Sequence, residues 1–333
     1  MKNIKHRMYW FVGIAFAMSV LLTGCGTDRQ DVESAYQIYD TTEAYLSGSA
    51  SSSDSVLELF ASDLCVGGTE NTESANVIAE CAESAAVFQV ESGEITYSQN
   101  IYEKNYPAST TKILTALIAL EYGDLDQLLT VSDAAIDDLD SSSSVCGLEK
   151  GDQITLREAL YGLMLCSGND AANVIAESIA GSTEAFADLM NAKAQELGAT
   201  HSHFVNAHGL PDEDHYTTAY DLYLIFNEAV KNEDFVTIIS TTSYDASYLD
   251  ASGNTVTQTW ANTNGYLSGK YEMPEGVTVI GGKTGTTEAA GYCLVLYSIN
   301  ESGSPIISIV MKGNSRSDMY KIMTQILTNF ANE

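Results

Sequence analysis

The chain has 333 residues, 45% of them hydrophobic, and it carries 45 acidic against 15 basic residues, a formal net charge of −30. So large a negative excess argues against nucleic acid as a partner and against direct adhesion to anionic lipid. The length is sufficient for a sizeable buried core.

The first 24 residues have the pattern of an export signal. Three basic residues within the first seven precede an apolar stretch from Trp10 to Leu22, which is short for a membrane span. Leu22-Thr23-Gly24-Cys25 resembles a bacterial lipobox, so Cys25 would become the lipidated first residue of the mature protein. A plain transmembrane anchor is the alternative. The pattern favours a lipid-anchored protein on the extracellular face of a bacterial cell membrane, in the cell envelope.

The segment 25–61 is acidic and rich in serine, as in 47–53, and it lacks a sustained apolar period. We interpret it as a flexible tether. The remainder, 62–333, matches a single α/β domain with a helical insertion.

A first motif, Ser109-Thr110-Thr111-Lys112, opens an apolar run that predicts a helix from Ser109 to Leu120. Residues three apart on a helix share a face, so the Lys112 amine can reach the Ser109 hydroxyl and take its proton. Pro107 suits the first turn, which places Ser109 near the positive end of the helix dipole.

A second motif, Ser167-Gly168-Asn169, interrupts two predicted helices. Thr155-Leu-Arg-Glu158 has the form of a capping box, and an apolar stripe continues from it to Cys166. The following helix, 171–180, is closed by Gly181. A hydroxyl and a carboxamide on such a turn can relay a proton and hold a substrate amide.

A third motif, Lys283-Thr284-Gly285, lies in a predicted strand that begins at Val277, and a hairpin of 291–299 and 305–311 follows. Glycines beside Lys283 let a substrate backbone lie close to the strand. Thr284 and Thr286 share one face and could bind a carboxylate beside Lys283. A last helix is expected over 317–330.

Cysteine and histidine offer weaker signals. Five cysteines follow Cys25, and Cys65 with Cys81 is the one pair that we consider for a disulfide. Four histidines crowd into fifteen residues, which raises the question of a metal site; they are His201, His203, His208 and His215.

Six segments together carry a family resemblance: 107–112, 165–172, 204–210, 217–222, 262–264 and 282–294. With them the chain resembles the serine-type D-alanyl-D-alanine carboxypeptidases among the low-molecular-mass penicillin-binding proteins (peptidase S11 type), from roughly Ala85 to the C-terminus. The resemblance implies an α/β (α+β) fold of the β-lactamase/transpeptidase kind, an antiparallel sheet flanked by helices with a helical subdomain near Ser167. It makes His208 part of a structural loop and needs neither metal nor cofactor.

Carried over by position, the resemblance assigns a role to each motif residue. Ser109 would be the nucleophile, Lys112 its general base and Ser167 a proton shuttle. Asn169 would bind the substrate amide, and Lys283, Thr284, Gly285 and Thr286 would form the strand that binds the terminal carboxylate, with Arg316 a further candidate. The backbone N–H groups of Ser109 and Thr286 would form the oxyanion hole.

The implied partners are peptidoglycan stem peptides, β-lactam antibiotics as inhibitors, and the membrane through the N-terminal lipid. Class A β-lactamases share the three motifs, but they add a Glu-x-x-Leu-Asn loop that is not found between Asn169 and Lys283. A carboxypeptidase is therefore preferred. A penicillin sensor or wall-binding protein that acylates without turnover stays open as a second alternative.

Overall fold

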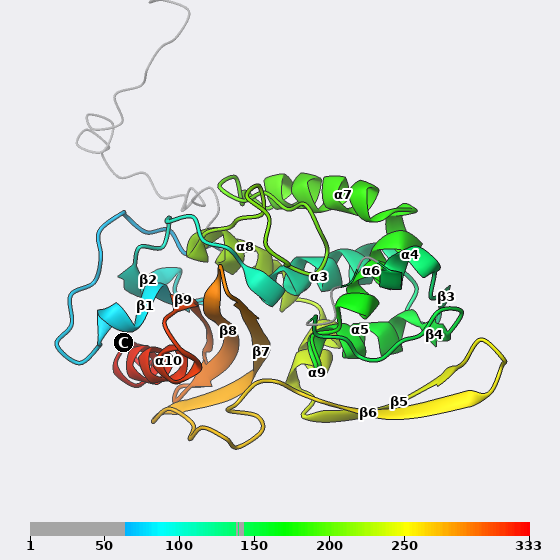
Figure 1. Ribbon diagram of the computed structural model, residues 1–333. Helices are drawn as coiled ribbons and strands as arrows, with labels where there is room; N and C mark the ends of the chain where they lie inside the picture. The colour runs from blue at the N-terminus through cyan, green and yellow to red at the C-terminus, as the bar shows by residue number, and fades with distance from the viewer. Residues whose placement is uncertain (1–63, 138, 140–142) are drawn as a thin grey trace, which may run out of the picture. The chain divides into compact units, whose positions relative to one another are not determined.

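Two antiparallel sheets and a set of helices make up the described part of the chain, residues 64–137, 139 and 143–333 (Figure 1). The structure is a computed structural model, and all the described residues belong to one compact unit, Glu58–Glu333. The predicted export signal at 1–24, the lipidation site Cys25 and the tether at 25–61 lie outside the described residues. The predicted start of the folded domain at residue 62 stays a prediction.

The larger sheet has five strands in the order β2-β1-β9-β8-β7, every neighbouring pair antiparallel. Its strands are β1 (Ala82–Gln89), β2 (Glu94–Gln99), β7 (Val277–Thr287), β8 (Gly291–Asn300) and β9 (Pro305–Gly313). The strand and hairpin predicted over 277–311 are thus confirmed. Among the described strands β7 lies at the edge of the sheet, so none of them pairs with it on the side away from β8.

The sheet separates two hydrophobic cores because successive side chains of a strand point to opposite faces. On β1, Ala85 and Val87 belong to the core beneath α10 (Arg316–Phe330), whereas Ala86 and Phe88 belong to the core shared with α3 (Lys112–Tyr122) and α8 (Ala219–Ala229). Full burial of a large apolar side chain contributes about 1.5–3 kcal/mol. Both faces of the sheet are therefore covered.

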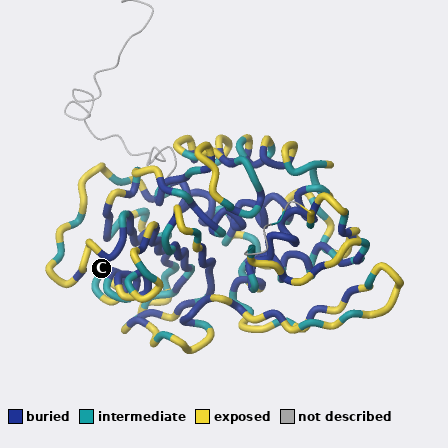
Figure 2. Tube along the Cα trace, in the orientation of Figure 1, coloured by how far each residue is buried: buried dark blue, intermediate teal, exposed yellow. Residues whose placement is uncertain are grey.

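The helical subdomain lies on the α3 side of the sheet (Figure 1). Its further helices are α4 (Asp133–Asp137), α5 (Leu156–Met164), α6 (Asn169–Ala180), α7 (Thr183–Glu196) and α9 (Glu233–Ser240). A smaller sheet, in the order β3-β4-β5-β6, consists of β3 (Leu128–Thr130), β4 (Gln153–Thr155), β5 (Ser243–Leu249) and β6 (Thr255–Ala261). Figure 2 shows that the β5–β6 hairpin is largely exposed or half-buried. The predicted α+β architecture is confirmed.

Capping residues determine where the helices around the second motif begin and end. The Thr155 side chain accepts a hydrogen bond from the backbone N–H of Glu158, which confirms the predicted cap of α5. Gly181 ends α6 in the left-handed conformation that a helix C-terminus favours, with a φ of 85°. Throughout the described ranges, no helix is both long enough and apolar enough to cross a membrane.

The disulfide considered for Cys65 and Cys81 is wrong, because both are free thiols. Cys65 lies in the core on the α8 side of the sheet and Cys81 in the core beneath α10, so the two are on opposite sides. The Cys65 thiol donates to the carbonyl of Gln89, and the Cys81 thiol donates to the carboxylate of Asp318. Cys146, Cys166 and Cys293 are likewise free.

Candidate active site

Ser109 and Lys112 lie one turn apart where the chain enters α3. We expected an α-helix from Ser109, but the first turn is a 3-10 helix, η2 (Ala108–Thr111), and the α-helix begins at Lys112. In a 3-10 turn the side chains at positions i and i+3 eclipse each other. The Lys112 Nζ accordingly lies 3.1 Å from the Ser109 Oγ, so the predicted contact within the first motif is present.

The Lys112 amine has no exposed surface and is held at three points. Besides Ser109 Oγ, it donates to the Asn169 Oδ1 at 2.7 Å and to the His208 carbonyl at 2.7 Å. Burial, and then the nearby charge of Lys283, hold the pKa of Lys112 well below its ordinary value. A neutral amine with a free lone pair can accept a proton from the neighbouring hydroxyl.

Ser167 occupies the turn between α5 and α6 in a left-handed conformation, with a φ of 63°. Its Oγ accepts a hydrogen bond from Lys283 Nζ at 3.0 Å, and the same amine donates to the carbonyl of Thr284 at 3.0 Å. Burial lowers the pKa of Lys283 to about 7. The turn thus places Ser167 against the third motif and Asn169 against Lys112.

Strand β7 passes directly beside Ser109. A Cβ at Gly285 would lie 3.0 Å from both the Pro107 carbonyl oxygen and the Ser109 nitrogen, so a side chain there would press the two segments apart. The Thr284 hydroxyl is 2.7 Å from that of Thr263. All eight predicted catalytic and substrate-binding residues therefore lie at one site, formed by η2, α3, the α5–α6 turn and β7.

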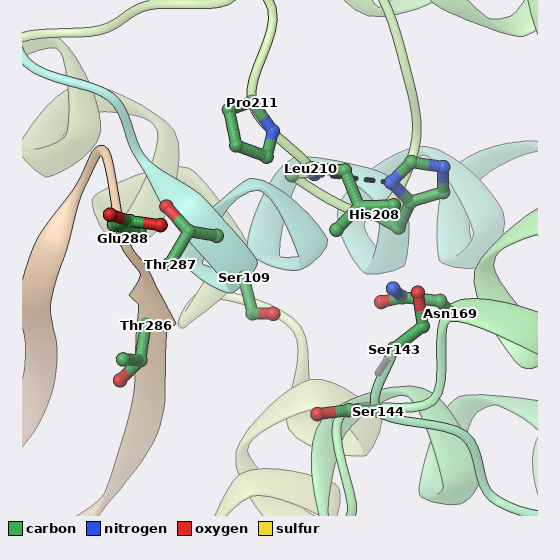
Figure 3. Close-up of a pocket in the computed structure, with 11 residues that line it drawn as sticks. Ser109, Ser143, Ser144, Asn169, His208, Leu210, Pro211, Thr286, Thr287 and Glu288 are labelled. Carbon is green, nitrogen blue, oxygen red and sulfur yellow. Dashed lines mark hydrogen bonds between the residues drawn. The ribbon is translucent and has the colours of Figure 1, made fainter. Parts of the chain in front are cut away.

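A cavity of about 260 Å³ opens over Ser109 (Figure 3). The described residues that line it are Ser109, Ser143, Ser144, Asn169, His208, Gly209, Leu210, Pro211, Thr286, Thr287 and Glu288. Lys112, Ser167 and Lys283 are buried behind this surface. Arg316, the further carboxylate candidate, is not among the lining residues; its guanidinium carbon lies 5.7 Å from the centre of the Tyr292 ring.

Asp170 is a buried residue at the site to which the sequence analysis assigned no role. Its carboxylate accepts hydrogen bonds from the backbone N–H groups of Cys146, Gly147 and Leu148 at 2.9–3.0 Å. The Asn169 N–H also donates to the Ser144 carbonyl at 2.8 Å. These bonds join the 143–148 loop, which lines the cavity, to the α5–α6 turn. The position of Asp170 directly after Asn169 was the signal in the sequence that could have identified it.

The clustered histidines are engaged in hydrogen bonds. His215 contacts the Thr111 hydroxyl at 2.8 Å and accepts from the Val205 N–H, while His208 Nδ1 accepts from the Leu210 N–H. Burial lowers the pKa of His208 to about 3 and that of His215 to about 4, so both are neutral at pH 7. Over the described residues, no group of three or more His, Cys, Asp or Glu side chains is arranged to hold a metal ion.

A comparison with protein families decides the assignment. The model of the D-alanyl-D-alanine carboxypeptidases, Peptidase S11, matches residues 69–315. The chain belongs to this family. Its Peptidase S11 region contains all three motifs, and the resemblance found in the sequence is confirmed.

Curated relatives carry the same family name. DacF of Bacillus subtilis, a D-alanyl-D-alanine carboxypeptidase, is 34% identical over 257 residues, which cover 75% of this chain and 62% of DacF. The D-alanyl-D-alanine carboxypeptidase of Streptomyces sp. (strain K15) is 35% identical over 245 residues, 69% of this chain and 82% of the relative. The chain therefore spans less than two thirds of the length of DacF.

A solved structure shares the Peptidase S11 fold described above. The crystal structure of the Streptomyces K15 DD-transpeptidase superposes with a TM-score of 0.67 at 34% sequence identity, covering 74% of this chain and 96% of that chain. A mutant of the same protein gives a TM-score of 0.70 at 33% identity, covering 76% of this chain and 98% of that chain.

Proposed function

We propose that this protein is a serine D-Ala-D-Ala carboxypeptidase that removes the terminal D-alanine from peptidoglycan stem pentapeptides and is inhibited by penicillin. Membership of the Peptidase S11 family supports the reaction class. The observation that carries the proposal is the contact of 3.1 Å between Ser109 Oγ and a fully buried lysine amine whose pKa is held well below its ordinary value. That pair forms an activated nucleophile and its general base.

In the acylation step, Ser109 Oγ attacks the carbonyl carbon of the penultimate D-alanine, and its proton passes to Lys112 Nζ. The oxyanion is met by the backbone N–H groups of Ser109 and Thr286, each worth about 3 to 4 kcal/mol in comparable sites. The C–N bond then breaks, and a proton delivered through Ser167 leaves with the D-alanine amine. An acyl ester on Ser109 remains, and water hydrolyses it.

The residues around the scissile bond bind different parts of the substrate. Lys283, Thr284 and Thr286 hold the terminal carboxylate, which the family mechanism requires. Asn169 uses its Oδ1 for Lys112, so its Nδ2 is the group that donates to the acyl amide. The carboxylate contact is released with the departing D-alanine, which favours turnover on peptides.

Among the alternatives, the cavity gives no support to a class A β-lactamase. Of the described lining residues, Glu288 is the one carboxylate, and it lies at the end of β7 rather than beside Lys112 and Asn169. Without a glutamate that positions water against the bulky penicilloyl group, we expect that adduct to persist. A sensor that acylates without turnover remains the second candidate.

We further propose that the protein works on the outer face of the bacterial cell membrane, anchored by lipid on Cys25. The lipobox-like Leu22-Thr23-Gly24-Cys25 and the apolar stretch before it support this location. The acidic segment 25–61 would then serve as the tether between the membrane and the wall peptides.

The test compares turnover on two substrates. We expect the purified protein to release D-alanine from diacetyl-Lys-D-Ala-D-Ala over many cycles, to form a stable penicillin adduct at Ser109, and to hydrolyse penicillin very slowly. Ser109→Ala should lose both labelling and turnover, as read by intact mass and D-alanine release. Rapid penicillin hydrolysis would favour a β-lactamase, and acylation without turnover on either substrate would favour a sensor.

A second variant tests the base. Lys112→Met preserves an unbranched side chain of similar length without the amine, so we expect acylation by penicillin to slow at least about 100-fold. The thermal transition should stay within a few degrees, because burying the amine itself costs free energy. An unchanged acylation rate would assign the base to another group.

A further inference from the structure

Among the described residues that line the cavity over Ser109, one has a charged side chain. Ten of the eleven described lining residues are neutral at pH 7, since burial keeps His208 unprotonated, and the exception is Glu288. The side chain of Glu288 is exposed, and it has no ion pair and no hydrogen bond with any described residue. Figure 3 shows it beside Thr287 at the rim of the cavity. An unpaired carboxylate here is available to a ligand.

Its position follows from the path of β7. The strand passes Ser109 at Gly285, continues through Thr286 and Thr287 along the cavity wall, and turns at Glu288 toward β8. The edge of β7 away from β8 is unpaired within the sheet, so an extended peptide can lie along it. Glu288 lies two residues beyond Thr286, and residues of an extended chain advance about 3.3 Å each.

The register of a bound peptide is fixed by the groups already placed. In the proposed function, the terminal carboxylate lies at Lys283 and at the hydroxyls of Thr284 and Thr286, and the scissile carbonyl lies between the backbone N–H groups of Ser109 and Thr286. The rest of the acyl chain must then continue past Thr287. The side chain of the residue that precedes D-Ala-D-Ala is therefore the part of the substrate nearest to Glu288.

We propose that Glu288 determines specificity by pairing with a free side-chain ammonium on the residue before D-Ala-D-Ala, as a diamino acid carries. This inference rests on the proposed function and names the form of the substrate that the site prefers: the peptide with its side-chain amine unblocked. A lysine-like ammonium on a flexible four-carbon stem suits such a contact, because it can reach a carboxylate at the rim without moving the backbone.

The size of the effect follows from the exposure of Glu288. Ion pairs at solvent-exposed sites are weak and screened by salt. We therefore expect the wild type to prefer the free-amine peptide over the acetylated one by about 2- to 5-fold in kcat/KM at low ionic strength. The preference should shrink toward unity in about 0.5 M salt, where the Debye length is only a few ångströms.

The experiment measures kcat/KM for D-alanine release from two peptides that differ by one acetyl group. These are Nα-acetyl-Lys-D-Ala-D-Ala and Nα,Nε-diacetyl-Lys-D-Ala-D-Ala. In Glu288→Gln we expect the ratio of the two kcat/KM values to fall to about 1, and in Glu288→Lys to fall below 1. Thermal transitions verify that each variant is folded.

Glu275→Gln is the matched control. Glu275 is exposed, has no hydrogen bond or ion pair among the described residues, and precedes β7 at the end opposite to Glu288. The control makes the same change in net charge, so a loss of preference through the general negative field of the protein would affect both variants. We expect Glu275→Gln to keep the wild-type ratio.

The outcomes separate this inference from the proposed function. A preference that is lost in Glu288→Gln and kept in Glu275→Gln supports the inference. Equal kcat/KM for both peptides in the wild type, or a preference that survives Glu288→Gln, overturns the inference and leaves the carboxypeptidase intact. No D-alanine release from either peptide by the wild type overturns the proposed function, and the inference with it.

Discussion

Lys112 and Lys283 are two lysines that the fold buries at one site, with exposed fractions of 0% and 1%. Desolvation disfavours the charged form of each, and the charge of Lys283 disfavours that of Lys112 further. The carboxylate of Asp170 is already occupied by four backbone N–H groups. In the proposed function the two lysines have opposite tasks: Lys112 accepts the proton of Ser109, whereas Lys283 must be charged to hold the terminal carboxylate.

This division predicts a pH dependence of kcat/KM for a peptide with a free terminal carboxylate. Lys283 is cationic below its pKa of about 7 and loses its charge above it. Substrate binding should therefore weaken as the pH rises through about 7, while the rate falls on the acid side as Lys112 becomes protonated. A pH profile of kcat/KM for diacetyl-Lys-D-Ala-D-Ala measures both limbs.

The methyl ester of the same peptide is the control, because it lacks the carboxylate that Lys283 would bind. Its kcat/KM should be low but should show no alkaline limb near pH 7. An alkaline limb of equal size for the acid and the ester would remove Lys283 from carboxylate binding.

At the scale of elements, the 204–210 segment packs against η2 and the start of α3, which carry Ser109 and Lys112. The Lys112 amine donates to the carbonyl of His208, and the Thr115 hydroxyl donates to that of Ala207 at 2.7 Å. Gly209 has a φ of 92°, and a Cβ on it would lie 1.8 Å from the Ala108 carbonyl oxygen. Only a residue without a side chain lets these two backbones approach so closely.

Gly209→Ala should therefore displace the turn that presents Ser109. We expect acylation by penicillin to fall at least about 10-fold, as a misplacement near 1 Å can cost more than that, together with a clear loss of thermal stability. Gly253→Ala is the control, since Gly253 has a φ of 81° at the tip of the β5–β6 hairpin with no atom within 4 Å of the added Cβ. It carries the backbone strain alone, about 1–2 kcal/mol, and should leave acylation unchanged. Normal acylation in Gly209→Ala would show that the close approach of Gly209 to Ala108 is not needed to position Ser109.

The sequence predicted the elements with strong periodic patterns, and it predicted the contacts that lie within one element. Ser109 and Lys112 meet because three residues span one turn, and the α5 cap follows from Thr155 and Glu158. The sequence analysis missed the 3-10 first turn, because that turn includes Ala108 at a φ of 49° with its carbonyl against Gly209, a contact between segments far apart in the chain. Glu288 was missed for a similar reason, because only the fold places it at the cavity. Asp170 follows Asn169 directly, but its hydrogen bonds to the backbone of 146–148 span more than twenty residues of sequence.

At the scale of the whole molecule, charge decides how the protein could be held at a membrane. All 45 acidic residues follow Cys25, so the part of the chain after Cys25 is repelled by anionic lipid rather than attracted to it. Electrostatic adhesion is therefore a poor anchor. A covalent lipid is a sufficient one only when it carries more than a single acyl chain, as a bacterial lipoprotein does, because one chain gives marginal binding.

The anchor is tested by Cys25→Ser, which removes the thiol that lipidation would modify. We expect metabolic labelling with a fatty acid to be lost, and the precursor to remain uncleaved and held, if at all, by its short apolar stretch. Mass spectrometry of the N-terminal peptide should show the diacylated cysteine only in the wild type. Cys65→Ser, at the next cysteine along the chain and buried in the core, should keep full labelling. Equal labelling of Cys25→Ser and wild type would mean that Cys25 is not the lipidated residue, and the retention of the protein at the membrane would then need a different cause.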